Sequence, residues 1–79
     1  MTFDAAAAIK HHLDTWLRLL GLDRTWRVTY EVVDGIEGAV ATNVYFVRKT
    51  GRRESHMKFD RERITSERLA EEAAVHECL

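Results

Sequence analysis

The stretch Trp26 to Val32, with the sequence WRVTYEV, decides the fold because its apolar and polar residues alternate without interruption. Alternation with a period of two is typical of a β-strand that has one face buried and the other in water. The residues predicted to face the core are Trp26, Val28, Tyr30 and Val32. A half-buried strand needs partner strands and a covering layer, so we expect both in the flanking sequence.

Two further strands are predicted after this stretch. The segment from Ala39 to Val47 is rich in β-branched and aromatic residues. Its weak alternation suits either a central strand covered on both faces or a strand that crosses the edge of the core. After a turn at Lys49 to Arg52, with Gly51 as its positive-φ residue, the segment Arg53 to Asp60 is expected to return as a strand. Its predicted inward side chains are Met57 and Phe59, and its predicted outward ones are His56, Lys58 and Asp60.

A helix is predicted before the strands, from Asp4 to Leu20. Apolar residues at helical spacing form one stripe along it, namely Ile9, Leu13, Trp16, Leu17 and Leu20. The charge of Asp4 is favourable near the positive end of the helix dipole. Gly21 is expected just past the end, where the backbone turns left-handed.

A second helix is predicted from residue 64 to Leu79. Thr65 is the expected N-cap, and Ile64 and Leu69 occupy the positions of a hydrophobic staple. The element order is therefore helix, three strands, helix. It predicts an α+β fold with a mostly antiparallel sheet that both helices cover, in a single domain over residues 1–79.

The composition fits a small globular domain. Apolar residues make up 46% of the 79 residues and charged residues 32%. The formal net charge of −1 provides no overall field that would attract nucleic acid or a membrane. The one cysteine cannot form an internal disulfide, no apolar run has transmembrane length, and residues 1–8 lack the features of a signal peptide. We therefore expect a cytoplasmic protein that does not contact membranes.

The last four residues carry the chemistry that the sequence suggests. His76-Glu77-Cys78-Leu79 are the first four of H-E-x-x-H, which places two histidines on one helical face as zinc ligands with a glutamate as general base. His76 is then the predicted metal ligand and Glu77 the predicted catalytic base. The second histidine would be the residue after Leu79. A His-Glu pair alone is common, but this one follows small residues on a helix that follows a sheet.

The layout as a whole resembles a known family. A Trp26-Arg27-Val28 strand, a Gly38-Ala39-Val40-Ala41 strand and a helix from Leu69 to Leu79 ending in His-Glu are similar to the short zincin-like metallopeptidases of phage and prophage genomes. These are related in layout to minimal protease domains of the SprT and ImmA type. The resemblance implies a zincin-like N-terminal half, a Zn²⁺ cofactor, and hydrolysis of a peptide or protein substrate. It places the second histidine and the third ligand beyond Leu79, so the 79-residue chain is expected to bind metal weakly and to be inactive.

An alternative function needs no catalysis. The chain would then be an interaction module, either a degenerate zincin that binds protein or a nucleic-acid binder that uses the basic hairpin 48–63. Seven basic and three acidic side chains lie between residues 48 and 63, a local excess of four positive charges. The candidate nucleic-acid ligands are Arg48, Lys49, Arg52 and Arg53. A solvated hairpin whose charges protect an exposed sheet edge explains the same pattern, and a homo-oligomer through an apolar surface is a further option.

The remaining titratable residues have simpler interpretations. His11 and His12 diverge by about 100° on a helix, so they are predicted to be a solvated pair. His56 is predicted to be a surface residue. Cys78 is predicted to be a small buried apolar residue and not a metal ligand. Glu72, one turn before His76, is either a solvated acid or a carboxylate that orients the imidazole.

Overall fold

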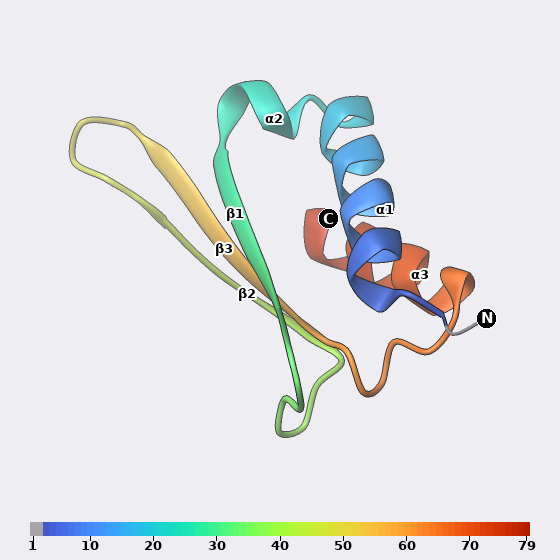
Figure 1. The fold of residues 1–79 in the computed structure, drawn as a ribbon. Helices are drawn as coiled ribbons and strands as arrows, with labels where there is room; N and C mark the ends of the chain where they lie inside the picture. The colour runs from blue at the N-terminus through green and yellow to red at the C-terminus, as the bar shows by residue number, and fades with distance from the viewer. Residues whose placement is uncertain (1–2) are drawn as a thin grey trace.

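The computed structural model describes residues 3–79 and contains three helices and three strands (Figure 1). In chain order the elements are α1 (Ala5–Leu19), α2 (Leu22–Thr25), β1 (Arg27–Val33), β2 (Ala41–Val47), β3 (Arg53–Asp60) and α3 (Glu67–Cys78). The predicted α+β class is therefore confirmed. The short helix α2 was not predicted. Within residues 3–79 no helix has both the length and the apolar character needed to cross a membrane.

The sheet has the strand order β1-β3-β2, with β3 in the centre. β3 pairs parallel with β1 and antiparallel with β2, so the sheet is mixed and not mostly antiparallel as expected. The sequence-adjacent strands β1 and β2 do not pair, because the last strand in the chain lies between them. The central place suits β3, since it alone among the strands contains fully buried apolar side chains, at Met57 and Phe59.

Strand β2 is an edge strand, which resolves the two interpretations of its weak alternation. It begins at Ala41 rather than Ala39 and pairs only with β3. Its second half lies beyond the cover of the helices, where β2 and β3 form a projecting hairpin (Figure 1). The exposed apolar side chains there are Val44, Tyr45, Phe46 and Val47. The turn is as predicted, with Gly51 at φ 86° and its N–H donating to the carbonyl of Arg48.

Helices α1 and α3 pack against each other on one face of the sheet (Figure 1). From β3 this inner face contributes Ser55, Met57 and Phe59, and from β1 it contributes Val28, Tyr30 and Val32. The predicted alternation in WRVTYEV is thus confirmed, because Thr29 and Glu31, which lie between these inward residues of β1, are exposed. Three members of the predicted α1 stripe are buried, Ile9, Leu13 and Leu17, whereas Leu20 is exposed. Among residues 3–79, no helix covers the other face of the sheet (Figure 1).

The ends of α1 follow the sequence signals. Asp4 is the N-cap, and its carboxylate accepts a hydrogen bond from the N–H of Ala7 at 3.1 Å. This contact satisfies one of the free N–H groups of the first turn. Gly21, just past the helix, has φ 71°, a conformation that costs glycine little.

The N-cap of α3 lies one residue later than predicted, and the helix begins at Glu67 rather than at residue 64. Ser66 is the N-cap, and its hydroxyl accepts from the N–H of Leu69 at 3.2 Å. Thr65 was therefore the wrong cap. The shift also removes the predicted staple, because the staple positions become Thr65 and Ala70. Ile64 is buried in the core instead, and Leu69 is exposed.

Alanines allow the two long helices to approach closely. Ala5 and Ala8 on α1 and Ala70, Ala73 and Ala74 on α3 are all buried. Side chains this small leave no space for added atoms where helix axes come close.

We predict that Ala74→Leu lowers the free energy of unfolding by about 1–3 kcal/mol, because the added atoms overpack the α1–α3 contact. The measurement is chemical denaturation followed by circular dichroism. Ala7→Leu on the exposed side of α1 is the matched control and should change stability little. Equal effects of the two variants would contradict the close packing of the helices.

Asp60 is a buried carboxylate at the end of β3, not the outward residue that alternation predicted. Its side chain is 1% exposed and accepts hydrogen bonds from the N–H groups of Gly35, Ile36 and Glu62 at 2.9–3.0 Å. Arg63 lies 3.5 Å away. Burial raises the pKa of Asp60, but the three N–H donors and Arg63 lower it by more, so that the pKa lies below its ordinary value. Asp60 thus ties the β1–β2 loop to the start of the β3–α3 loop.

We predict that Asp60→Asn destabilises the fold at neutral pH, because an amide cannot accept from all three donors and places its own N–H₂ among them. A lowered folded-state pKa means that the ionised form stabilises the fold above the ordinary value near 3.8 and loses this effect as pH falls through the lowered pKa. Thermal melts at a series of pH values should therefore show wild type and Asp60→Asn converging in acid. Asp34→Asn, at an exposed ion pair with Arg61, is the control and should show no such convergence.

Candidate functional site

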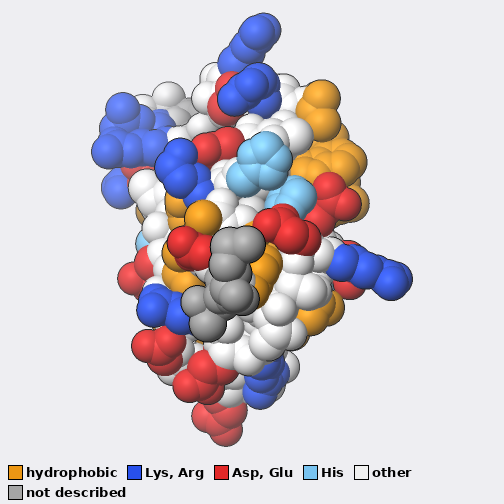
Figure 2. Space-filling model, turned by 45° about the vertical axis from the view of Figure 1, so that its right-hand side comes forward, with side chains coloured by type: hydrophobic (Ala, Val, Ile, Leu, Met, Phe, Trp, Pro, Cys, Tyr) orange, Lys and Arg blue, Asp and Glu red, His pale blue; other side chains and the backbone are white. Residues whose placement is uncertain are grey.

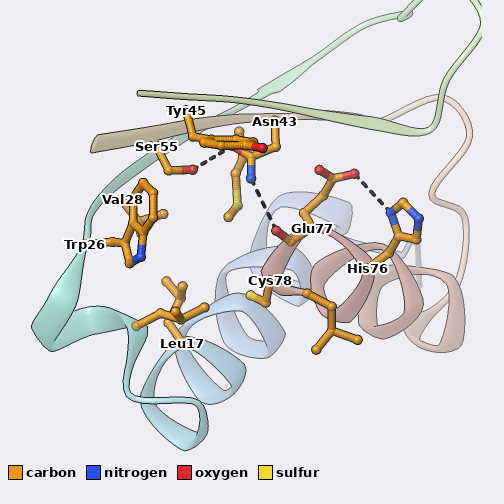
Figure 3. Close-up of a pocket in the computed structure, with 12 residues that line it drawn as sticks. Leu17, Trp26, Val28, Asn43, Tyr45, Ser55, His76, Glu77 and Cys78 are labelled. Carbon is orange, nitrogen blue, oxygen red and sulfur yellow. Dashed lines mark hydrogen bonds and ion pairs between the residues drawn. The ribbon is translucent and has the colours of Figure 1, made fainter. Parts of the chain in front are cut away.

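His76 and Glu77 lie in the last turn of α3 and face different surroundings (Figure 3). The His76 side chain is 85% exposed, whereas the Glu77 side chain is only 9% exposed. The two are joined by a 3.3 Å contact between His76 Nδ1 and Glu77 Oε1. The predicted general base is thus a largely buried carboxylate, and the predicted metal ligand presents its ring to solvent.

A pocket of about 420 Å³ lies between the end of α3 and the inner face of the sheet (Figure 3). Most of its wall is apolar, with side chains such as Leu17 of α1, Trp26 just before β1, Val28 of β1 and Met57 of β3. Polar side chains at this pocket include Asn43, Ser55, His76 and Glu77. Concave, mostly apolar pockets with few polar groups are typical of binding sites.

Asn43 connects the end of α3 to the sheet. Its side-chain N–H₂ donates to the backbone carbonyl of Glu77 at 3.3 Å, and its Oδ1 accepts from the hydroxyl of Ser55 at 2.6 Å (Figure 3). The carbonyl of Glu77 belongs to the last turn of the helix, where carbonyls lack helical partners. Sequence analysis missed both residues. The available signal was one amide within the apolar segment 39–47 and one hydroxyl on the inner face of β3.

We predict that Asn43→Ala lowers the free energy of unfolding by about 1–3 kcal/mol, because it leaves the buried Ser55 hydroxyl without its acceptor. It should also speed amide hydrogen exchange in the last turn of α3. Denaturation and exchange measured by mass spectrometry test both effects. Thr42→Ala on the opposite face of β2 is the control, and exchange that is equally fast in both variants would exclude Asn43 as the anchor.

Cys78 packs partly against the core and lines the same pocket. Burial raises the pKa of its thiol, and the neighbouring Glu77 carboxylate raises it further. A raised pKa lowers the fraction of reactive thiolate. Cys78 was predicted to be a small buried apolar residue; in the structure it is only partly buried.

The donor atoms at the end of α3 are of the kinds that zinc takes, but their number is small. A catalytic zinc ion takes three protein ligands and leaves one position open. Among residues 3–79, no group of three or more His, Cys, Asp or Glu side chains is arranged to hold a metal ion. His76 contributes one imidazole there and Glu77 one carboxylate. Taken alone, the described residues do not complete a catalytic zinc site.

The other histidines are engaged elsewhere. His12, predicted to be solvated, is 15% exposed and bridges α1 to α3, with Nε2 2.8 Å from Glu67 and Nδ1 3.5 Å from Glu71. The helix side of the molecule shows histidine side chains beside acidic ones (Figure 2). The prediction was wrong for His12 because the partner acids come from a helix far away in the sequence. His11 is exposed, as predicted.

His56 and Glu72 agree with their simpler interpretations. His56 lies on the outer face of the sheet, 2.7 Å from the Thr29 hydroxyl and 3.5 Å from Glu31. Glu72 accepts from Arg68 at 3.0 Å and is well exposed.

The basic residues of the predicted nucleic-acid site gather at the tip of the β2–β3 hairpin. We call Arg48, Lys49, Arg52 and Arg53 the basic tip; all four are exposed. Arg48 donates to Glu54 at 2.9 Å, and its guanidinium lies 5.1 Å from the Phe46 ring centre. The ion pairs found among residues 3–79 include none from Lys49, Arg52 or Arg53. The remaining basic residues of 48–63 are paired with acids, so the local positive charge concentrates at this tip.

Comparisons with known proteins were made at three levels. No family model matches the chain, and no match was found among curated proteins or among solved structures. The zincin-like resemblance of residues 26–28, 38–41 and 69–79 stays a prediction.

Proposed function

We propose that this chain is a zinc-dependent metallopeptidase-like domain, in which His76 is a metal ligand and Glu77 the general base. The observation that carries this proposal is the pairing of a buried Glu77 carboxylate with an exposed His76 ring in the same helical turn. This turn borders both the pocket and strand β2. A carboxylate sheltered from solvent beside an imidazole suits proton transfer during hydrolysis.

Each residue has a separate part in this proposal. Glu77 takes a proton from the attacking water and returns it to the leaving amine, which are the two transfers that peptide hydrolysis needs. His76 keeps Nε2 available as a donor atom, since Nδ1 faces Glu77. Zinc, when bound, supplies Lewis acidity. Because residues 3–79 alone do not complete the site, the proposal requires further ligands from outside them.

The sheet edge next to this turn suits an extended peptide. Across the antiparallel ladder, the carbonyl of Val40 accepts from the N–H of Asp60, and the N–H of Arg48 donates to the carbonyl of Arg52. In such a ladder, the backbone N–H and C=O groups of successive residues point alternately toward the partner strand and away from it. The groups of the even-numbered β2 residues therefore point toward β3. The backbone groups that face the free edge are those of Ala41, Asn43, Tyr45 and Val47. A peptide added as a new strand would pair with these groups and pass the end of α3.

The metal-binding half of the proposal is tested by completing the motif. A chain with one histidine added after Leu79 should bind Zn²⁺ more tightly than the same chain with one alanine added, because residues four apart lie on one helical face. His76→Ala should abolish the gain, as measured by calorimetry. An equal gain in the presence of His76→Ala would contradict the role of His76.

The catalytic half is tested on a protein extended past Leu79 that binds zinc. Glu77→Gln should lower peptide cleavage by about 10²–10⁴-fold, the usual effect of losing a general base, and leave the zinc content unchanged. Glu72→Gln on the same helix is the matched control and should cleave normally. Peptide binding that persists in an extended, zinc-loaded protein without any cleavage would favour a non-catalytic, degenerate module instead.

A further inference from the structure

The free edge of β2 leads directly from the end of α3 to the basic tip. Asn43 contacts Glu77, and Arg48, just past the end of β2, follows five residues later, which corresponds to about 17 Å at 3.4 Å per residue. A peptide paired with the edge would therefore reach both places at once. The tip holds four positive charges, and the neighbouring acid Glu54 forms an ion pair with one of them, Arg48.

We propose that the basic tip binds acidic residues of a peptide lying along β2, and so selects peptides with acids about five residues from the position opposite Asn43. This inference rests on the proposed function for the location of the peptide. It adds a preference for charge that the end of α3 does not provide. Lys49, Arg52 and Arg53 are available for such contacts, since the ion pairs among residues 3–79 do not include them.

The pocket adds a second preference to the same peptide. In an antiparallel or parallel pair, side chains opposite each other project on the same face of the sheet. A peptide residue opposite Asn43 or Tyr45 would project on the inner face, where the pocket lies. Its wall of Trp26, Val28 and Met57 suits an apolar side chain. The selected peptide thus carries an apolar residue near Asn43 and acids near the tip.

The free backbone groups of β2 favour a peptide over a single-stranded nucleic acid. Binding of single strands depends on aromatic faces that are free to stack on bases. Here Arg48 lies over one face of the Phe46 ring at 5.1 Å, and Trp26 has Arg53 over its ring at 5.8 Å and an edge contact with Tyr45 at 6.0 Å, whereas Tyr45 itself is 67% exposed. The free N–H and C=O groups of the β2 edge can form a β-ladder only with a partner that has its own backbone N–H and C=O groups.

The experiment measures binding, not cleavage, by fluorescence anisotropy with labelled peptides. One peptide carries a leucine and, five residues away on either side, a pair of glutamates; its control carries glutamines in their place. The glutamate peptide should bind about tenfold more tightly at low salt, the effect of a few exposed ion pairs, and this preference should shrink at high salt. The double variant Lys49→Glu/Arg52→Glu should remove the preference.

The matched control is Arg18→Glu/Arg68→Glu, which changes the net charge equally on exposed helix positions and should keep the preference. An unchanged preference in Lys49→Glu/Arg52→Glu would overturn the inference. So would an oligonucleotide of equal charge that displaces the glutamate peptide completely, since the tip would then be a nucleic-acid site. If wild type shows no preference for the glutamate peptide while the extended protein still cleaves peptides in a Glu77-dependent way, this inference alone is wrong. If wild type prefers the glutamate peptide but the extended protein cleaves nothing, the proposed function alone is wrong.

Discussion

The inner face of β3 is the constraint on which the rest of the structure depends. Met57 and Phe59 are almost completely buried, and the apolar stripe of α1 and the alanine face of α3 belong to the same core. A sheet of three strands has only one central position, and the strand whose inner side chains are most deeply buried occupies it. The C-terminal end of this strand is secured as well, since Asp60 holds the backbone of the β1–β2 loop through Gly35 and Ile36.

The central place of β3 has a direct consequence for function. It moves β2 to an edge, where α3 contacts it, and so brings a strand with free backbone groups next to His76 and Glu77. Had β2 been central, the end of α3 would face a strand whose hydrogen bonds are already used. The hydrogen bonds from Ser55 to Asn43 and on to the carbonyl of Glu77 then fix the helix end to this edge.

Basic and acidic side chains are also separated on the surface. Three basic side chains that form no ion pair within residues 3–79, Lys49, Arg52 and Arg53, lie at the hairpin tip, whereas Glu67 and Glu71 of α3 contact His12 across the helix pair. A chain with a net charge of −1 can therefore present a strongly basic surface over a short distance. Averages over the whole chain conceal such a surface, because exposed charges act mainly within about one Debye length.

The sequence by itself determined most of the elements: the WRVTYEV alternation, the stripe of α1 with the acidic Asp4 at its start, the left-handed Gly21 and Gly51, and the helical setting of His76 and Glu77. These features depend on local periods and on single-residue backbone preferences, which neighbours in the chain encode. Only the tertiary structure decided the strand order, the burial of Asp60, the bridge from His12 to α3 and the link from Asn43 to Glu77. Each of these joins residues distant in sequence, and their proximity follows from how the apolar faces are buried together, which no local pattern records.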